Sequence, residues 1–391
     1  MAAMDAMDLG RAATHGAITA APTISTLTLL SGRCQTLAKD LQTAVGKLAE
    51  LNPILTGRAK KSEGKVWVEP GVHHALFRIA ECPKECPLIA PLDFKSKLQF
   101  LEGLEKHLVD PLTAIQTLHI GSQVFLVELM TFEEPFVCFV VHLSHLVGDA
   151  KTLYDLVGQL NALLAHQEVK PLQWDSPARL SLELVPLCKA DRERISRWGT
   201  LGWLAQKICG PARKSRVSLL SKSGIEKQKL ELLSSESKFL SSNDVITAAL
   251  SRAIKNSKVM NIAVNLRGRK CEENCAGNFW HNVPMAHQAA QDPNAVRALL
   301  PKLQYYKDGE VPWTPFAAGR YSFITNWTAF TQHLEVEGLK VECHLVHGNF
   351  LRQNPTNVAV VFHASRDALA LSHNVPDKNL DATGLLGALL S

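Results

Sequence analysis

The chain has 391 residues, of which 46% are hydrophobic and 20% charged. It can therefore bury the cores of two ordinary domains, and we do not expect a disordered protein. The formal net charge is only +5, and no long basic run is interleaved with aromatic residues, which argues against a nucleic-acid-binding protein.

Membrane and secretory classes also lack support. The longest apolar run beside a motif, Phe136 to Val141, is far shorter than the ~20 residues of a membrane span and predicts one buried strand. The first sixteen residues include Asp5 and Asp8 and no continuous apolar stretch, so they predict neither a secretory signal nor a transit peptide. We therefore expect a cytoplasmic protein without a membrane span.

The nine cysteines are scattered, which fits free thiols in a reducing compartment better than a disulfide framework. Cys82 and Cys86 are separated by three residues, as are Cys271 and Cys275. Paired knuckles of a structural zinc site more often have two intervening residues, so we expect no metal.

In the first half of the chain, the apolar spacing predicts an amphipathic helix over Leu27 to Leu51. Residues 54–71 alternate around a Ser-Glu-Gly turn and predict a β-hairpin. Segments 122–132 and 135–143 predict two adjacent strands. The single apolar stripe of residues 151–165 predicts the helix that follows.

The pattern loosens between about 170 and 229, where Pro, Gly, Ser and basic residues are frequent. We therefore predict an N-terminal domain over 1–185, a crossover linker over 186–235 and a C-terminal domain over 236–391. Residues 241–257 predict a helix, because a Ser/Asn/Asp cluster precedes periodic apolar positions. Further strands are predicted at 260–266, 321–327, 357–364 and 368–375.

The candidate site is His145 with Asp149, four residues apart. The same spacing recurs at His363/Asp367 and at His373/Asp377, so spacing alone is weak evidence. At His145, however, a buried strand ends and a helix begins, which is where open α/β layers place functional groups. The nearby helix N-terminus disfavours an imidazolium and favours the neutral ring that a general base needs.

The same residues also have possible structural roles. A packed, hydrogen-bonded histidine is the alternative for His145, and Asp149 stands where a helix N-cap or a buried ion pair is expected. We take His142 as structural. The chain has no G-x-S-x-G, G-x-x-x-x-G-K-[ST], G-x-G-x-x-G or H-E-x-x-H pattern, so the hydrolase, P-loop, dinucleotide-binding and zincin classes lose their markers.

With these residues in place, the chain resembles the plant-type BAHD acyltransferases, within the wider group of carnitine acyltransferases, wax-ester synthases and peptide-synthetase condensation domains. HLVGD, residues 145–149, is similar to the family's His-x-x-x-Asp motif. The other similar segments, in the family's order, are LAELNPILTGRAKK (48–61), SSNDVITAALSRAI (241–254), NIAVNLRGRK (261–270), AGNFWHNV (276–283) and FITNWTAF (323–330).

The resemblance implies an α/β fold with two similar-sized domains, each a mixed sheet with helices, and a tunnel at the domain interface. It implies acyl-CoA as co-substrate, no permanently bound cofactor, a small-molecule alcohol or amine as acceptor, and a monomer. His145 would take the acceptor's proton as it attacks the thioester, with no acyl-enzyme.

The resemblance also assigns roles to other residues. Asp149 would pair with Arg267, and Trp327 with Thr325 or Asn326 would donate hydrogen bonds to the oxyanion. Structural support is expected from Gly277, Asn278 and Gly338. Cationic groups should meet the CoA phosphates, and the candidates are Arg213, Lys214 and Arg216, which would otherwise be a solvated basic linker.

Two departures leave alternatives open. Ala150 follows Asp149 where the family has Gly, and the family's Asp-Phe-Gly-Trp-Gly is replaced by HLEVEGLKVE (333–342), in which only Gly338 matches. The alternatives are a condensation-type reaction with the acyl group on a carrier protein, and a catalytically silent homologue that binds a small molecule or partner.

Overall fold

The computed structural model forms two compact units. The first unit comprises residues 1–181, 266–279 and 330–350, and the second comprises 182–265, 280–329 and 351–391. The residues described are 7–8, 23–62, 65–69, 76–81, 93–104, 123–132, 135–174, 213–233, 239–255, 257–300, 321–352, 354, 356–381, 383, 387 and 389–390.

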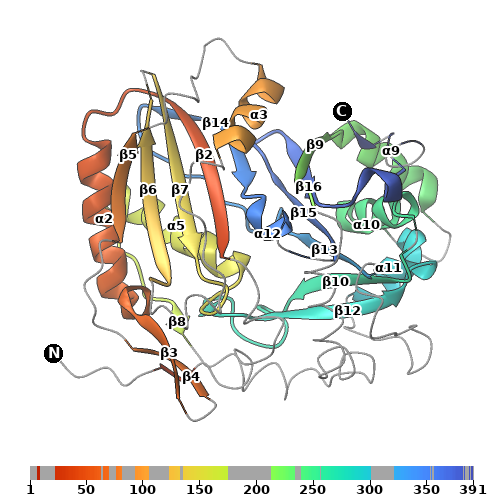
Figure 1. Ribbon diagram of the computed structural model, residues 1–391, viewed down its shortest axis with the longest axis horizontal. Helices are drawn as coiled ribbons and strands as arrows, with labels where there is room; N and C mark the ends of the chain where they lie inside the picture. Colours follow the sequence, from red (N-terminus) through yellow and green to blue (C-terminus); the bar gives the residue numbers. More distant parts are fainter. Residues whose placement is uncertain are drawn as a thin grey trace. The chain divides into compact units, whose positions relative to one another are not determined.

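A five-stranded sheet forms the core of the first unit, in the order β14-β2-β7-β6-β5 (Figure 1). The strands are β14 (Leu339–Val346), β2 (Ile24–Gly32), β7 (Phe136–Leu143), β6 (Phe125–Thr131) and β5 (Phe77–Glu81). Only the β5–β6 pair is parallel. Every residue of β7 except Val137 is buried, as expected for a central strand covered on both faces.

Within the described part of the first unit, three helices accompany this sheet. Helices α2 (Leu37–Leu51) and α5 (Ala150–Leu164) contact each other, α2 contacts β5, and α5 contacts β7. Helix α3 (Phe94–Leu104) contacts β14 and β2. A separate three-stranded sheet contains β1 (Met7–Asp8), β4 (Lys65–Glu69) and β3 (Arg58–Ser62), and a 3₁₀ turn, η2, covers Pro53–Thr56.

The helix predicted over Leu27 to Leu51 is wrong in its first third. Residues Ile24–Gly32 are strand β2, and the helix begins only at Leu37. Thr and Leu alternate over Thr26–Leu29, and Ile24–Leu30 are all buried, as in a strand that is covered on both faces. The leucines of this strand and those of the following helix together fit a helical spacing, so the strand and the helix were predicted as one helix.

The other predicted elements of the first unit are confirmed. Strands β3 and β4 form the expected hairpin. Strands β6 and β7 pair antiparallel, and α5 follows β7 within one residue of the predicted start.

A six-stranded sheet forms the core of the second unit, in the order β12-β10-β13-β15-β16-β9. The strands are β12 (Trp280–Ala286), β10 (Val259–Asn265), β13 (Tyr321–Asn326), β15 (Asn357–His363), β16 (Leu369–His373) and β9 (Arg216–Leu220). β10, β13 and β15 run parallel to one another, and the remaining pairs are antiparallel. The predicted strands of this half are confirmed.

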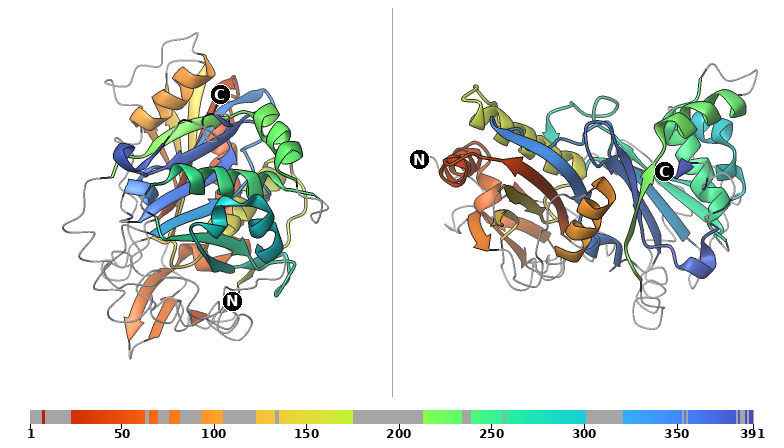
Figure 2. Two further views of the ribbon diagram at one scale, coloured as in Figure 1. Left: turned by 90° about the vertical axis from the view of Figure 1, so that its right-hand side faces the viewer. Right: turned by 90° about the horizontal axis from the view of Figure 1, so that it is seen from above.

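Helices α9 (Lys222–Leu232), α10 (Ser242–Ala253) and α11 (Pro293–Leu299) lie on one side of this sheet (Figure 2, right). The predicted helix 241–257 is α10, and Ser241 and Asp244 form a capping box at its start. The short elements are β8 (Gln173–Trp174), β11 (Cys275–Ala276), α12 (Asn349–Arg352), η4 (Ala289–Gln291) and η7 (Asp377–Asn379).

The expected linker, 186–235, is corrected where the structure describes it. Residues 186–212 lie outside the described residues, but β9 pairs with β16 and α9 follows it within the second unit. The segment RVSLL has the alternation and the β-branched residue of an edge strand, and Ser221 caps α9 by accepting a hydrogen bond from Gly224 N. The basic composition of the segment suggested a linker, although its sequence contains both the strand pattern of β9 and the N-cap of α9.

The cysteine pairs and the absence of a membrane span were also addressed by the sequence. Cys82 and Cys86 lie outside the described residues, whereas Cys271 and Cys275 are free thiols. Among the helices that the structure describes, none is both long enough and apolar enough to span a bilayer.

Candidate active site

The turn between β7 and α5 presents His145. Asp149 is the N-cap of α5, and its carboxylate accepts hydrogen bonds from Thr152 N at 3.0 Å and Thr152 Oγ1 at 3.1 Å. Gly148 lies where the turn is tightest, since a Cβ there would be 2.8 Å from Leu143 Cδ2 and 2.9 Å from Thr152 Cγ2. The cap and the close packing hold the turn in one conformation.

Asn278 fixes the His145 ring. Its Nδ2 donates to the backbone carbonyls of His145 at 2.7 Å and Leu146 at 3.5 Å, so its Oδ1 faces His145 Nδ1 at 2.9 Å. An amide oxygen only accepts, so Nδ1 must carry the proton of the neutral ring and Nε2 must carry the lone pair. This is the tautomer in which Nε2 can act as a base.

Burial keeps that ring neutral. The side chain of His145 is buried, and the loss of solvent lowers the pKa of its imidazole below 6.5, against opposing effects of its own backbone carbonyl, the Asp149 charge and Asn278. Asp149 therefore influences His145 through its charge, while the hydrogen bond to the ring comes from Asn278.

Arg267 and Asp149 form a buried ion pair, which the sequence resemblance had implied. Arg267 Nη1 lies 2.9 Å from Asp149 Oδ2, Nη2 lies 3.1 Å from Oδ1, and Phe279 N donates to Oδ2 at 3.0 Å. The Arg267 side chain is fully buried and also donates from Nε to Cys275 O at 2.6 Å. The Asp149 carboxylate thus has five donor groups within hydrogen-bond distance, one of them the Thr152 hydroxyl.

The segment 266–279 supplies the partners of both motif residues. Its strand β11 pairs with β8, and Asp149 N donates to Gly277 O at 3.2 Å. Gly277 has φ +139°, a conformation that L side chains rarely adopt, so glycine is required there. Gly277 and Asn278 therefore both contact the turn that carries His145 and Asp149.

Gly338 lies elsewhere in the first unit. It has φ +80° and precedes β14, where a Cβ on Gly32 would meet its carbonyl oxygen at 2.1 Å. Its role is to let β14 begin against the end of β2.

Thr325, Asn326 and Trp327 belong to the second unit, at the end of β13. Trp327 Nε1 donates to Thr325 Oγ1 at 2.9 Å, while Asn326 Oδ1 accepts from Thr328 N at 3.0 Å and Oγ1 at 2.7 Å. At the end of β13 these hydrogen bonds join Trp327 to Thr325 and Asn326 to Thr328.

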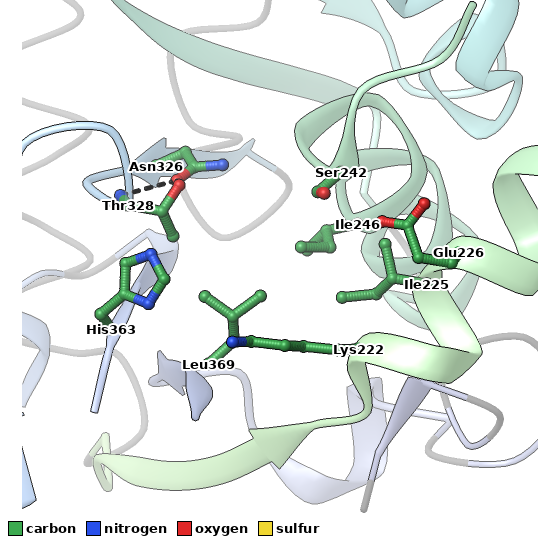
Figure 3. A pocket seen from close by; sticks show the side chains of 9 residues that line it. All are labelled: Lys222, Ile225, Glu226, Ser242, Ile246, Asn326, Thr328, His363 and Leu369. Atoms are coloured by element: carbon green, nitrogen blue, oxygen red, sulfur yellow. Dashed lines mark hydrogen bonds between the residues drawn. The ribbon is translucent and has the colours of Figure 1, made fainter. Parts of the chain in front are cut away.

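Asn326 faces a pocket of about 340 Å³ within the second unit (Figure 3). Figure 3 shows Asn326, Thr328 and His363 on one side of the pocket and Ser242, Ile246 and Glu226 across from them. The remaining lining residues are Lys222, Ile225 and Leu369. The lining combines an apolar floor with hydroxyl, amide, cationic and carboxylate groups.

Two of the three cations expected at the CoA phosphates already have partners in the second unit. Arg213 Nη1 donates to Asn357 Oδ1 at 2.8 Å, and burial lowers the pKa of the Arg213 guanidinium. Arg216 forms an ion pair with Asp377. Lys214 is exposed.

Several solved structures share the fold. TRI101 of F. sporotrichioides, complexed with coenzyme A and T-2, is 10% identical, with a TM-score of 0.70 over 99% of each chain. Polyketide synthase associated protein 5 of Mycobacterium tuberculosis is 16% identical, with a TM-score of 0.60 over 97% of this chain and 95% of that one. The first condensation domain of the calcium-dependent antibiotic synthetase, with substrate analogue 3a, is 12% identical, with a TM-score of 0.61 over 99% and 94%.

No family model matches the sequence, and no curated protein matches it significantly. The structural likenesses establish the fold: it is the mixed α/β fold of TRI101, a BAHD acyltransferase, and of condensation domains. The fold that the sequence resemblance predicted is confirmed.

Proposed function

We propose that the protein is an acyltransferase that moves an acyl group from a CoA thioester to a hydroxyl or amine of a small molecule, with His145 as general base. Nε2 takes the proton of the acceptor as its oxygen or nitrogen attacks the thioester carbonyl. The carbon–sulfur bond then breaks, and the CoA thiolate recovers the proton from the imidazolium. The acyl group passes directly to the acceptor without an acyl-enzyme.

One observation supports this proposal above the others: Asn278 Oδ1 accepts from Nδ1 of the buried His145 ring, which puts the lone pair of the neutral ring on Nε2, and burial lowers the pKa of that ring. The similar structures also support the proposal, since the TRI101 structures contain coenzyme A with T-2 or with deoxynivalenol.

Thr325 and Trp327 are proposed to stabilise the oxyanion. Trp327 Nε1 donates to Thr325 Oγ1, so the hydroxyl hydrogen of Thr325 points away from the indole and is available to an oxygen on that face. Asp149 and Arg267 are proposed as structural support for the turn that carries His145.

For the donor phosphates we propose the exposed Lys214 together with Lys222 at the pocket, because Arg213 and Arg216 are already engaged. Condensation domains share the fold, which supports a carrier-protein thioester as the second candidate donor. An acyl-pantetheine without the nucleotide separates the two candidates. Only an enzyme that binds CoA should have a higher KM for it than for the acyl-CoA.

The deciding experiment measures thiol release from a panel of acyl-CoAs with mixed alcohol and amine acceptors. We expect wild type to release CoA and His145→Ala to be slower by ~10²-fold or more, because proton transfer is lost. His166→Asn is the matched control, since His166 is exposed and has φ 54°, which Asn tolerates. Equal release by wild type and His145→Ala under every condition would favour a silent binding homologue.

A further inference from the structure

Thr152 lies at the centre of the contacts around His145, although no sequence motif assigns it a role. It is the third residue of α5, and its side chain is fully buried. Its hydroxyl accepts hydrogen bonds from Arg267 Nη2 at 2.9 Å and Gly277 N at 3.0 Å. It has two acceptors for its single hydrogen, Gly277 O at 2.9 Å and Asp149 Oδ1 at 3.1 Å.

These contacts use the whole hydrogen-bonding capacity of a hydroxyl, which is one hydrogen and two lone pairs. The hydroxyl therefore holds the N–H of Gly277, and it shares its hydrogen between Gly277 O and Asp149 Oδ1, while Arg267 Nη2 also donates to Gly277 O at 2.9 Å. Gly277 is the residue before Asn278, whose amide sets the tautomer of His145. Two hydrogen bonds on one residue restrict the peptide on each side of it, and the next side chain is placed by that restriction.

The methyl group of Thr152 fixes the direction of its hydroxyl. Cγ2 lies so close to Gly148 that a Cβ on that glycine would be 2.9 Å away. A β-branched residue in a helix has few χ1 rotamers, and this contact selects one of them. Serine at this position would keep the hydroxyl but lose the contact, and valine would keep the branched shape but lose the hydroxyl.

We infer that Thr152 is a positioning residue for the proposed base: its hydroxyl holds Gly277, and through it the Asn278 amide that orients the His145 ring. The inference rests on the proposed function for its catalytic consequence. Its structural consequence, a change in the surroundings of the ring, does not depend on that function.

The experiment compares Thr152→Val, Thr152→Ser and wild type, with Thr247→Val as matched control. Thr247 is a fully buried threonine of α10 whose hydroxyl has no hydrogen-bond partner among the residues described. Two quantities are measured: kcat and KM for acyl-CoA, and the titration of His145 followed by nuclear magnetic resonance of its ring carbon.

We expect Thr152→Val to lower kcat about 10-fold or more with KM changed less than about two-fold, since small misplacements of a reacting group cost rate rather than binding. The His145 titration should move upward toward 6.5 as solvent reaches a loosened ring. Thr152→Ser should recover most of kcat and of the titration, and Thr247→Val should match wild type in both.

A folded Thr152→Val protein with wild-type kcat and an unmoved His145 titration would overturn the inference, as would Thr152→Ser behaving like Thr152→Val. Where valine prevents folding, Thr152→Cys, with its weak hydrogen-bonding thiol, supplies the same comparison. If wild type releases no CoA from any thioester, the proposed function fails, and the titration alone still decides whether Thr152 positions the ring.

Discussion

Replacing Asp149 with Asn tests the ion pair at the base of the site. The carboxylate accepts from Arg267 Nη1 and Phe279 N on Oδ2, and from Arg267 Nη2, Thr152 N and Thr152 Oγ1 on Oδ1. An asparagine has one accepting oxygen. If the NH2 group of the asparagine takes the Oδ2 position, it faces two hydrogen-bond donors. If it takes the Oδ1 position, it faces three.

The expected loss of stability follows from this count. The fully buried Arg267 would keep its charge without a counterion, and removing one partner of a buried pair costs about 3–5 kcal/mol. For a unit of this size, each kcal/mol lowers Tm by about 2–4 °C, so Tm should fall by about 10 °C. The rate of acyl transfer should fall as well, since the turn that carries His145 begins at this cap.

The assay is urea unfolding at pH 7, with hydrogen exchange of the β7–α5 peptide to localise the loss. Asp377→Asn is the control, because its ion pair with Arg216 is solvent-exposed and such pairs contribute less than about 1 kcal/mol. If Asp149→Asn changed the unfolding free energy as little as Asp377→Asn does, the carboxylate would not be the counterion that holds this site.

Three further outcomes are expected. Because burial lowers the pKa of His145, its base form should persist to lower pH than that of a free imidazole, so the acid limb of kcat/KM should have its midpoint below 6.5; a midpoint at 6.5 or above would contradict this. Asn278→Asp places a carboxylate at Nδ1, which favours the imidazolium, so that limb should move to higher pH; a profile unmoved by the substitution would show that Asn278 does not contact the ring. Burial and the Arg216 charge lower the pKa of His373 from 6.5 to about 4, so the unfolded chain binds a proton that the folded chain refuses, and stability falls as the pH drops through this window. His373→Gln should remove about 3 kcal/mol of the stability lost between pH 7 and pH 4, measured by urea unfolding at both values, and an undiminished loss would rule out this residue as its source.

Local patterns in the sequence were sufficient where one element decides its own conformation. The alternation around 63–64, the apolar run of β7 and the stripe of α5 each predicted the correct element. They failed at Ile24–Gly32, where leucines at helical spacing belong to a strand, and at β9, where basic composition suggested a linker. In both cases pairing with a distant strand determined the conformation.

Part of the site was available to a closer reading of the sequence. The strand predicted over 321–327 has a period of two, which places Thr325 and Trp327 on one face and Asn326 on the other. Thr152 left no comparable signal, because its hydroxyl acts on Gly277, 125 residues away. Only the return of segment 266–279 to the first unit makes that contact.

That return explains why the histidine and the aspartate occur together. Segment 266–279 carries Arg267, which needs a buried counterion, and Asn278, which needs a ring nitrogen to accept from. The turn after β7 offers Asp149 to the first and His145 to the second. The four-residue spacing puts one residue at the cap of α5 and the other in the turn before it, so a single segment neutralises the charge and sets the tautomer. The aspartate would thereby support the proposed catalysis without touching the proton that the histidine is proposed to move.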